Sequence, residues 1–202
     1  MSKATPRDKA LAAVVEVALN RGITGLSLRA IAEAAGTSHR MLIHHFGSRE
    51  GLLVEVVRTV EERQRAVLAE LSGPPGDPSA DLTYRFWQHL RSPQLAPQER
   101  LFFEVYAQAL QGRPWAEPML DGIVDDWAAP VSAMVEAAGA SPATARAVAR
   151  LSVAVGRGLL LDVLATRDEA ATDEAMRLFA DLLLGYLGGT PAGRPAGAAD
   201  PG

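Results

Sequence analysis

Five residues with hydrogen-bonding side chains stand close together early in the chain: Thr37, Ser38, His39, Arg40 and His44. Hydroxyl, imidazole and guanidinium groups bind phosphate oxygens and the edges of nucleic-acid bases. An arginine can hydrogen-bond the O6 and N7 atoms of one guanine together, which contributes ~1–3 kcal/mol of base discrimination. This grouping predicts base readout by His39 and Arg40, and base or phosphate contacts by the other three.

The histidines of this segment, His39, His44 and His45, also suggest a metal site. Adjacent side chains diverge on a helix, however, and the spacing matches no zinc pattern. We therefore expect neither a metal nor another cofactor, and we expect His45 to pack beside Phe46. The chain also lacks a coupled nucleophile and base, so we do not expect an enzyme.

Two short helices joined by a tight turn must position these side chains. Ser27 and Ser38 stand where each helix would begin, and a serine hydroxyl there accepts a backbone N–H of the first turn. Gly36 lies between the helices, where the turn needs a residue that tolerates positive φ. The arrangement fits a helix-turn-helix unit, whose second helix enters the DNA major groove. On spacing alone, a helical hairpin within a core remains an alternative.

The helices on either side of this pair are predicted from their apolar periodicity. Residues 6 to 21 form an amphipathic helix that begins near Pro6 and covers the pair. Ser48 caps a long helix that runs to about Leu71, and this helix can link the first part of the chain mechanically to the rest.

The segment resembles the N-terminal domain of TetR-family transcriptional regulators. The matching residues are Gly25 to Ser27, Ile31 to Ser38 and the exit HHFGSREGLL over 44 to 53. The resemblance implies a three-helix DNA-binding domain, in which Arg29 can also reach the groove and Arg49 binds phosphate. Two residues depart from the family pattern: Arg49 replaces a lysine and keeps its charge, whereas Ile43 replaces a tyrosine that touches a phosphate.

Charge is distributed unevenly along the 202 residues. The whole chain carries a formal charge of −4, but residues 1 to 60 hold eight Lys or Arg against five Asp or Glu, so their net charge is +3 and that of the remainder is −7. A basic segment joined to an acidic one is expected when a single end of a protein meets DNA. The chain has no cysteine and no uninterrupted apolar run of ~18 residues, which favours a cytoplasmic protein without membrane spans.

The second part of the chain is predicted to be a larger helical body. A Gly- and Pro-rich break over 72 to 79 must be a loop, and helices follow over about 80 to 91, 97 to 111, 116 to 138, 142 to 165 and 171 to 187. Pro130 should kink or divide the third of these. We expect about nine helices in an all-α fold, with domains over 1–48 and 49–187 and a disordered tail over 188–202.

Most aromatic residues lie in this second part, where they favour an apolar pocket with polar groups at its edge. Any one of them can equally belong to the core. The resemblance implies that the helices here enclose an inducer site, for an apolar or aromatic small molecule. The candidate pocket residues are Phe86, Trp87, Phe103, Tyr106, Trp127 and Met134.

The last two helices are apolar on more than one side, which requires a partner to cover them. The stretch over 158 to 166 also resembles the family's penultimate helix, which pairs with its two-fold mate in a four-helix interface. A monomeric core is the alternative. The candidate interface residues are Val148, Leu151, Val155, Leu159, Leu178, Leu182 and Tyr186.

These observations predict a ligand-responsive repressor that binds a near-palindromic double-stranded DNA operator as a homodimer. The alternative is a helical small-molecule-binding or scaffold protein that has lost the ability to bind DNA, since Ile43 removes a polar contact.

Overall fold

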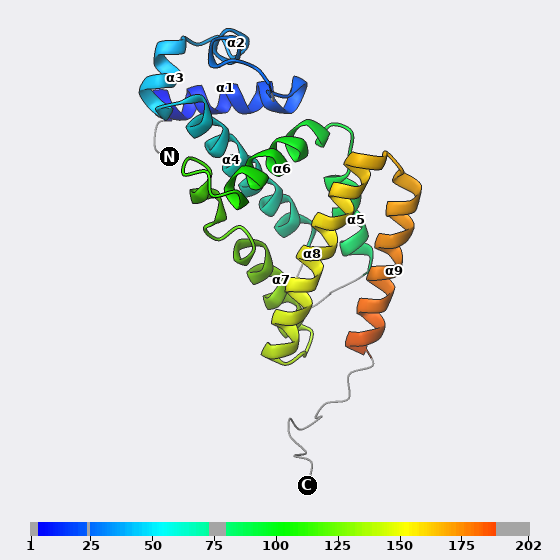
Figure 1. The fold of residues 1–202 in the computed structure, drawn as a ribbon. Coiled ribbons are helices and arrows are strands. Elements are labelled where there is room, and N and C mark those ends of the chain that lie inside the picture. Colours follow the sequence, from blue (N-terminus) through cyan, green and yellow to red (C-terminus); the bar gives the residue numbers. More distant parts are fainter. Residues whose placement is uncertain (1–3, 24, 73–79, 189–202) are drawn as a thin grey trace.

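The computed structural model describes residues 4–23, 25–72 and 80–188, which form helices joined by turns (Figure 1). In chain order they are α1 (Pro6–Arg21), α2 (Leu28–Ala34), α3 (His39–Phe46), α4 (Arg49–Leu71), α5 (Ala80–Leu90), α6 (Ala96–Leu110), the 3₁₀ helix η1 (Glu117–Leu120), α7 (Asp125–Ala137), α8 (Pro142–Thr166) and α9 (Glu169–Gly188). The predicted all-α fold with about nine helices is confirmed for these residues. None of the described helices is both long and apolar enough to cross a membrane.

Serine hydroxyls define where three consecutive helices begin. Ser27, Ser38 and Ser48 each accept a hydrogen bond from the amide three residues further on, at 3.2, 3.1 and 3.0 Å. These bonds satisfy amides that have no partner within the helix. Gly36, in the turn between α2 and α3, has a φ of +63°, which a residue with a side chain rarely adopts. The predicted caps and turn are therefore confirmed.

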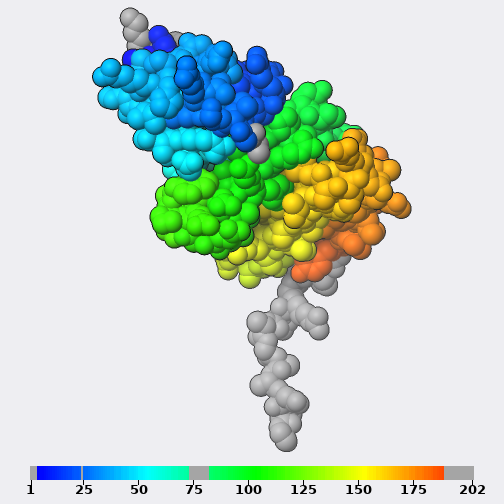
Figure 2. Space-filling view, turned by 45° about the horizontal axis from the view of Figure 1, so that its top comes forward, coloured from blue at the N-terminus to red at the C-terminus, as the bar shows by residue number. Residues whose placement is uncertain are grey.

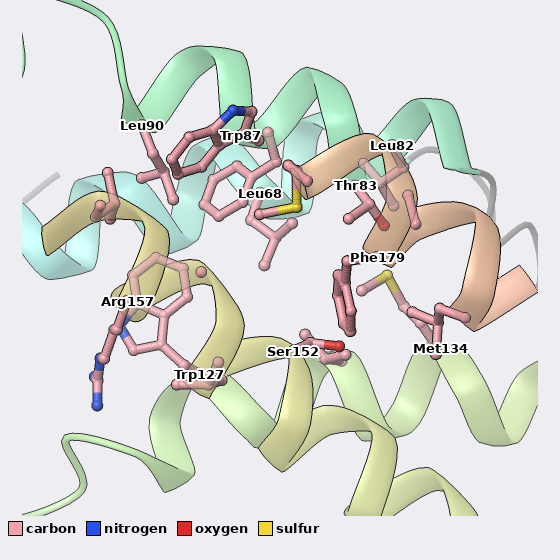
Figure 3. Close-up of a pocket in the computed structure, with 18 of the residues that line it drawn as sticks. Leu68, Leu82, Thr83, Trp87, Leu90, Trp127, Met134, Ser152, Arg157 and Phe179 are labelled. Atoms are coloured by element: carbon pink, nitrogen blue, oxygen red, sulfur yellow. The ribbon is translucent and has the colours of Figure 1, made fainter. Parts of the chain in front are cut away.

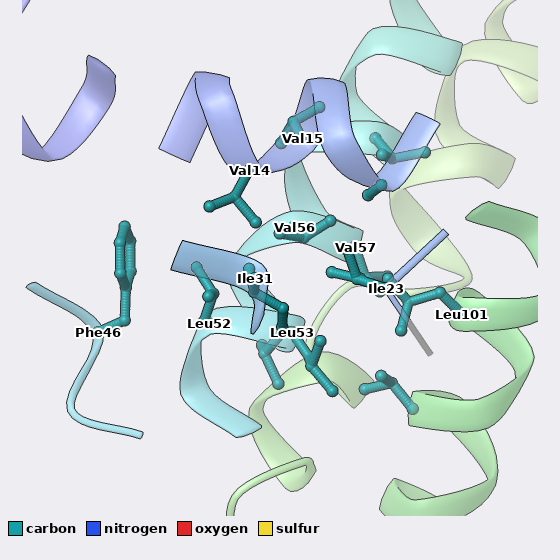
Figure 4. Close-up of a cluster of buried hydrophobic side chains, with 14 of the residues drawn as sticks. Val14, Val15, Ile23, Ile31, Phe46, Leu52, Leu53, Val56, Val57 and Leu101 are labelled. Atoms are coloured by element: carbon teal, nitrogen blue, oxygen red, sulfur yellow. The ribbon is translucent and has the colours of Figure 1, made fainter. Parts of the chain in front are cut away.

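Helices α1 to α3 form an N-terminal lobe, which stands out from the rest of the molecule (Figure 2). The hydrophobic core of the lobe is one cluster of buried side chains, which continues into α4 and α6 (Figure 4). Its fully buried members include Val14, Ile31, Leu42, Leu52 and Val56, and Leu101 of α6 is also buried in it. The first half of α4 is thus packed as part of the lobe.

Helices α5 to α9 form the body, into which the second half of α4 extends (Figure 1). Helices α7 and α8 pack together, and α9 packs against both α5 and α8. Apart from those that α6 and η1 contribute to the lobe core, the buried apolar residues of the body fall into three small clusters, centred on Trp127, Trp87 and Val135. This division of the core leaves room for a cavity between the clusters.

The helix predicted over 116 to 138 is wrong in its first part. The chain there forms η1 and a turn before α7 begins at Asp125, because Pro118 opens the short 3₁₀ helix and Gly122 adopts a φ of +72°. Pro130 lies inside α7, which is not divided at that point. The break over 72–79 and the tail over 188–202 fall almost entirely outside the described residues, and the proposed domain boundary at 48/49 stays a prediction.

Candidate nucleic-acid interface and ligand cavity

Helix α3 buries one face and leaves the other on the surface. Leu42 and Phe46 pack into the lobe. Ser38, His39, Arg40 and His44 are exposed, and Thr37 is half-buried. The polar side chains grouped by the sequence are therefore brought together on one exposed face, at the N-terminal end of which the Ser38 cap orders the backbone.

Two apolar side chains share this surface with the polar ones. Met41 and Ile43 are each 40% exposed, although both are large and hydrophobic. Apolar groups on a recognition helix can contact the methyl group of thymine. Arg29 of α2 is also exposed. Ile43 thus adds apolar surface to this face, and it cannot replace the polar contact of a tyrosine.

Arg49 is held within the molecule, in contrast to Arg40. Its Nε donates a 2.7 Å hydrogen bond to the carbonyl oxygen of Leu26, and its Nη1 lies 3.9 Å from a carboxylate oxygen of Glu50. These contacts join the start of α4 to the turn before α2. A phosphate contact by Arg49 stays a prediction, and the structure gives this side chain a positioning role in addition.

His45 points in a different direction from the exposed polar face. Its ring lies edge-on to that of Phe46, with 6.1 Å between ring centroids, as predicted. The side chain is half-buried, and its Nε2 is a buried atom without a hydrogen-bond partner. His45 therefore contributes to packing at the base of α3.

The outer surface of α8 and α9 carries several large apolar side chains. Leu151 and Leu161 of α8 are each 53% exposed, and Leu178, Leu182 and Tyr186 of α9 are between 58% and 64% exposed. Isolated exposed leucines are ordinary, but a set on two neighbouring helices marks an interaction surface. We call these five residues the α8–α9 face.

Three predicted interface residues on α8 do not belong to this face. Val148 is 5% exposed and packs with Val135, while Val155 and Leu159 are partly buried in the cluster around Trp87. The stripe of α8 that carries Val148 points into the body, and an interface role for these three residues stays a prediction. Leu151 points outward instead.

The body contains a cavity of about 160 Å³, lined by residues of α4 to α9 (Figure 3). Four of the candidate pocket residues, Phe86, Trp87, Trp127 and Met134, line it. Phe103 and Tyr106 are not among its lining residues. They pack around Phe102 instead, with ring centroids 5.2 and 5.5 Å from it, because this part of α6 faces the lobe core.

Polar side chains gather at one end of this apolar cavity. Glu61 and Gln64 come from α4, Glu99 from α6 and Arg157 from α8. The Gln64 amide donates to Glu99 at 2.5 Å, and the Trp127 indole donates to Glu61 at 2.5 Å. The sequence analysis missed these groups. The signal was present, since Glu61 and Gln64 interrupt the buried stripe of α4 that also includes Val57 and Leu68.

Burial changes the acidity of both carboxyl groups. Desolvation raises the pKa of Glu99 to about 7, an effect that the neighbouring Glu61 increases and the Gln64 hydrogen bond opposes. Desolvation likewise raises the pKa of Glu61, against the lowering effects of Trp127, Arg157 and Arg65. The cavity thus contains a carboxyl group that changes its charge near neutral pH.

A second polar cluster fixes one wall of the cavity. Asp173 of α9 accepts hydrogen bonds from Trp87 Nε1 at 2.7 Å, from Arg91 Nη2 at 2.8 Å and from the Tyr84 hydroxyl at 3.2 Å. All three donors lie on α5 or directly after it. The cluster joins α5 to α9 and holds the Trp87 indole in place.

Known proteins resemble this chain in both sequence and structure. Residues 10–56 match the family model described as bacterial regulatory proteins, tetR family. A solved member of the TetR family from Streptomyces coelicolor A3 is 30% identical, with coverage of 89% of this chain and 98% of that one and a TM-score of 0.60. This chain belongs to the TetR family.

The other similarities agree with a TetR-family regulator. The multidrug binding protein EbrR, solved in complex with proflavin, is 31% identical, with 88% of this chain and 98% of that chain covered and a TM-score of 0.59. The HTH-type transcriptional regulatory protein RaaS of Mycobacterium tuberculosis is 71% identical over 28 residues, which are 14% of this chain and 13% of RaaS. The TetR-family chain is thus a DNA-binding transcriptional regulator with the helix-turn-helix in α2 and α3.

Proposed function

We propose that this protein is a repressor that binds a near-palindromic operator as a homodimer and releases it when a small molecule occupies the cavity. The observation that carries the proposal is the position of α4. Its first half belongs to the lobe that presents α3, and its second half contributes Glu61, Gln64 and Leu68 to the cavity wall.

The DNA contacts of the proposal come from the exposed face of α3. His39 and Arg40 read base edges, while Ser38, Thr37 and His44 contact bases or phosphates, and Arg29 and Ile43 extend this surface. Apart from Thr37, which is half-buried, these side chains are exposed, and this exposure supports the assignment because they can reach a groove without unfolding the lobe.

Homodimer formation uses the α8–α9 face. Burial of this face against a second copy removes several large apolar side chains from water, at roughly 25 cal/mol per Å² of apolar surface. The two-fold symmetry of such a pair matches a near-palindromic site, whose half-sites lie one DNA turn apart, roughly 34–36 Å. Pairing of the two bodies therefore sets the distance between the two lobes.

Effector binding uses the cavity. The dimer conformations differ in the separation of the two lobes, and a ligand shifts the population toward the conformation that it binds more tightly. Only such a difference in affinity can release DNA. The complex of EbrR with proflavin supports an aromatic effector. The role is a regulatory one, without turnover of the effector, as in a family of transcriptional regulators.

A mobility-shift titration with the DNA upstream of the protein's own gene tests this function. Arg40→Ala should reduce the preference for this fragment over shuffled DNA, by ~1–3 kcal/mol if Arg40 reads a guanine. Arg146→Ala removes an exposed arginine near the start of α8, far from α3, and should leave the titration unchanged (Figure 1).

The proposal fails if the wild-type protein does not distinguish the two fragments, or if Arg146→Ala has the same effect as Arg40→Ala. A protein that binds a small molecule but no DNA would instead support the alternative function, in which Ile43 marks a lobe that has lost its DNA contacts.

A further inference from the structure

The cavity has more acidic than basic groups in its wall. Among the described residues that line it, Glu61, Glu99 and Arg157 are the ionisable ones. Glu99 is 4% exposed, and Glu61 is half-buried with its carboxylate bonded to the Trp127 indole. With both carboxyl groups ionised, the wall carries one uncompensated negative charge, which is costly in a buried apolar site.

Arg157 does not face the centre of the cavity. Its Nη2 donates to the carbonyl oxygen of Ile123, and its guanidinium lies 5.3 and 5.6 Å from the ring centroids of Phe102 and Tyr106. Figure 3 shows the guanidinium directed toward the rim of the cavity. Arg157 therefore offsets one carboxylate from the side and leaves the interior without a cation.

The other charged groups near this end are paired with one another. Arg65 of α4 lies 3.8 Å from Asp126 of α7, and these two residues act on Glu61 with opposite signs. On α9, Asp173 is paired with Arg91. On α5, burial lowers the pKa of His89, which keeps the imidazole neutral at pH 7. These groups leave the excess acid of the Glu61–Glu99 pair in place.

We propose that the cavity takes an organic cation with one aromatic ring, and that the positive charge of this ligand displaces the carboxyl proton of Glu99. The carboxyl O–H bond breaks, the proton leaves to solvent, and the carboxylate pairs with the ligand cation, so the net charge inside the cavity stays the same. The inference rests on the proposed function, since it names the effector class of the same cavity.

The aromatic wall and the size of the cavity support this ligand class. Faces of tryptophan and phenylalanine rings attract cations, and Phe86, Trp87 and Trp127 all line the site. Apolar cavities of about 150 Å³ in protein cores bind benzene, so the volume of about 160 Å³ here suits a single ring. A neutral ligand of the same shape would fill the same space but leave the proton in place.

Phenyltrimethylammonium and tert-butylbenzene form a matched pair of probes, because they have nearly the same shape and differ in charge, and neither titrates near neutral pH. Binding of each to the full-length protein is measured by tryptophan fluorescence, since Trp87 and Trp127 line the cavity. Calorimetry of the cation in two buffers of different ionisation enthalpy counts the protons released.

The cation should bind at least tenfold more tightly than the neutral probe at pH 8. Because the pKa of Glu99 is about 7, its affinity should rise about tenfold between pH 6 and pH 8, with about half a proton released per cation at pH 7. Affinity for tert-butylbenzene should not change with pH. Equal binding of the two probes, binding of neither, or cation binding without proton release would overturn the proposal.

Glu99→Gln is the decisive variant. It keeps an acceptor for the Gln64 amide but removes the excess charge, so it should lower the affinity for the cation at least tenfold at pH 8 and abolish its pH dependence. Retained binding of tert-butylbenzene shows that the variant is folded. Glu62→Gln, the same change at an exposed position of α4, should match the wild type. An unchanged cation affinity in Glu99→Gln would contradict the proposal.

These outcomes are separate from those for DNA binding. The probe titrations contain no DNA, so a failure of the cation inference leaves the mobility-shift result intact. If the protein failed to recognise the operator, the affinities of the cavity for the two probes could still be measured.

Discussion

The N-terminal lobe and the body are both built from apolar helices, but they bury different kinds of side chain. The buried residues of α1, α2 and α3 are all apolar. The buried polar residues of the described chain are Gln64, Gln98, Glu99, Ser132 and Thr172, all of which lie in the body or in the second half of α4. The lobe is therefore suited to hold a surface rigid, whereas the body is suited to respond to a ligand.

Packing follows the same division. The lobe core is continuous across α1 to α4 and α6, while the rest of the body core is split into small clusters around a cavity. Side chains beside a void lose contacts on one side, so that region resists deformation less. Because α4 belongs to both regions, a change in the cavity can move the lobe as a unit.

Truncation of two leucines on α4 tests this contrast in packing and should have the largest effect. The change Leu52→Ala, at a position that is 0% exposed in the lobe core, should lower the unfolding free energy of the protein by about 4 kcal/mol. The change Leu68→Ala, at a position that is 6% exposed but lines the cavity, should lower the unfolding free energy by about 2 kcal/mol or less. Urea unfolding at fixed protein concentration measures both. Equal losses would show that the two regions are equally well packed.

The pH dependence of stability tests the polar character of the body. The pKa of Glu99 is about 7 in the folded state and near the ordinary glutamate value of 4.5 in the unfolded state, so the folded state holds more protons between these pH values. The unfolding free energy should therefore fall as pH rises from about 4.5 through 7, by roughly 3 kcal/mol in total.

Glu99→Gln should lack this contribution. Its stability relative to the wild type should increase over the same pH interval, as followed by urea unfolding at several pH values. A constant difference between the two proteins would mean that Glu99 has an ordinary pKa and is not desolvated.

Charged substitutions on the α8–α9 face test whether the body sets the distance between the two lobes. Leu178→Glu with Leu182→Glu should dissociate the dimer and weaken operator binding about 100-fold, because two linked lobes bind one duplex with the gain of bivalency. Sedimentation and anisotropy measure the two effects. Leu110→Glu, at a position that is 68% exposed on α6, is the control and should change neither. A monomeric wild-type protein would contradict the assignment.

Two helix caps provide the smallest test. Ser38 and Ser141 each accept a hydrogen bond from an amide three residues later, at 3.1 and 3.2 Å. Either change to alanine should cost ~1 kcal/mol of stability. Only Ser38→Ala should also weaken DNA binding, since it begins α3, whereas Ser141 begins α8 in the body. If both variants bound DNA with similar affinity, the ordered start of α3 would not be needed for DNA recognition.

Local signals in the sequence were sufficient for the lobe. Serine caps, Gly36 and the apolar spacing of α1 to α4 each act over a few residues, so the helices could be predicted without tertiary information. The family match of residues 10–56 covers the same region. The exposed face of α3 follows from that geometry, because Leu42 and Phe46 determine which side is buried.

The cavity could be predicted only in part. Aromatic content indicated Trp87 and Trp127, but it could not separate them from Phe103 and Tyr106, because core and pocket aromatics have the same local pattern. Glu61 and Glu99 are brought together by the packing of α4 against α6, across 38 residues of sequence. The same limit applies to Val148, whose inward direction depends on the rotation of α8 against α7.

The salt dependence of operator binding tests the central claim most directly, namely that the exposed face of α3 meets DNA through two lobes paired by the body. Anisotropy of the labelled promoter fragment should show log K falling linearly with log salt, with a slope of roughly −0.9 for each phosphate neutralised. The Leu178→Glu and Leu182→Glu variant should show about half the wild-type slope, since one lobe then binds alone. A wild-type affinity independent of salt, or a slope unchanged in the variant, would contradict the account.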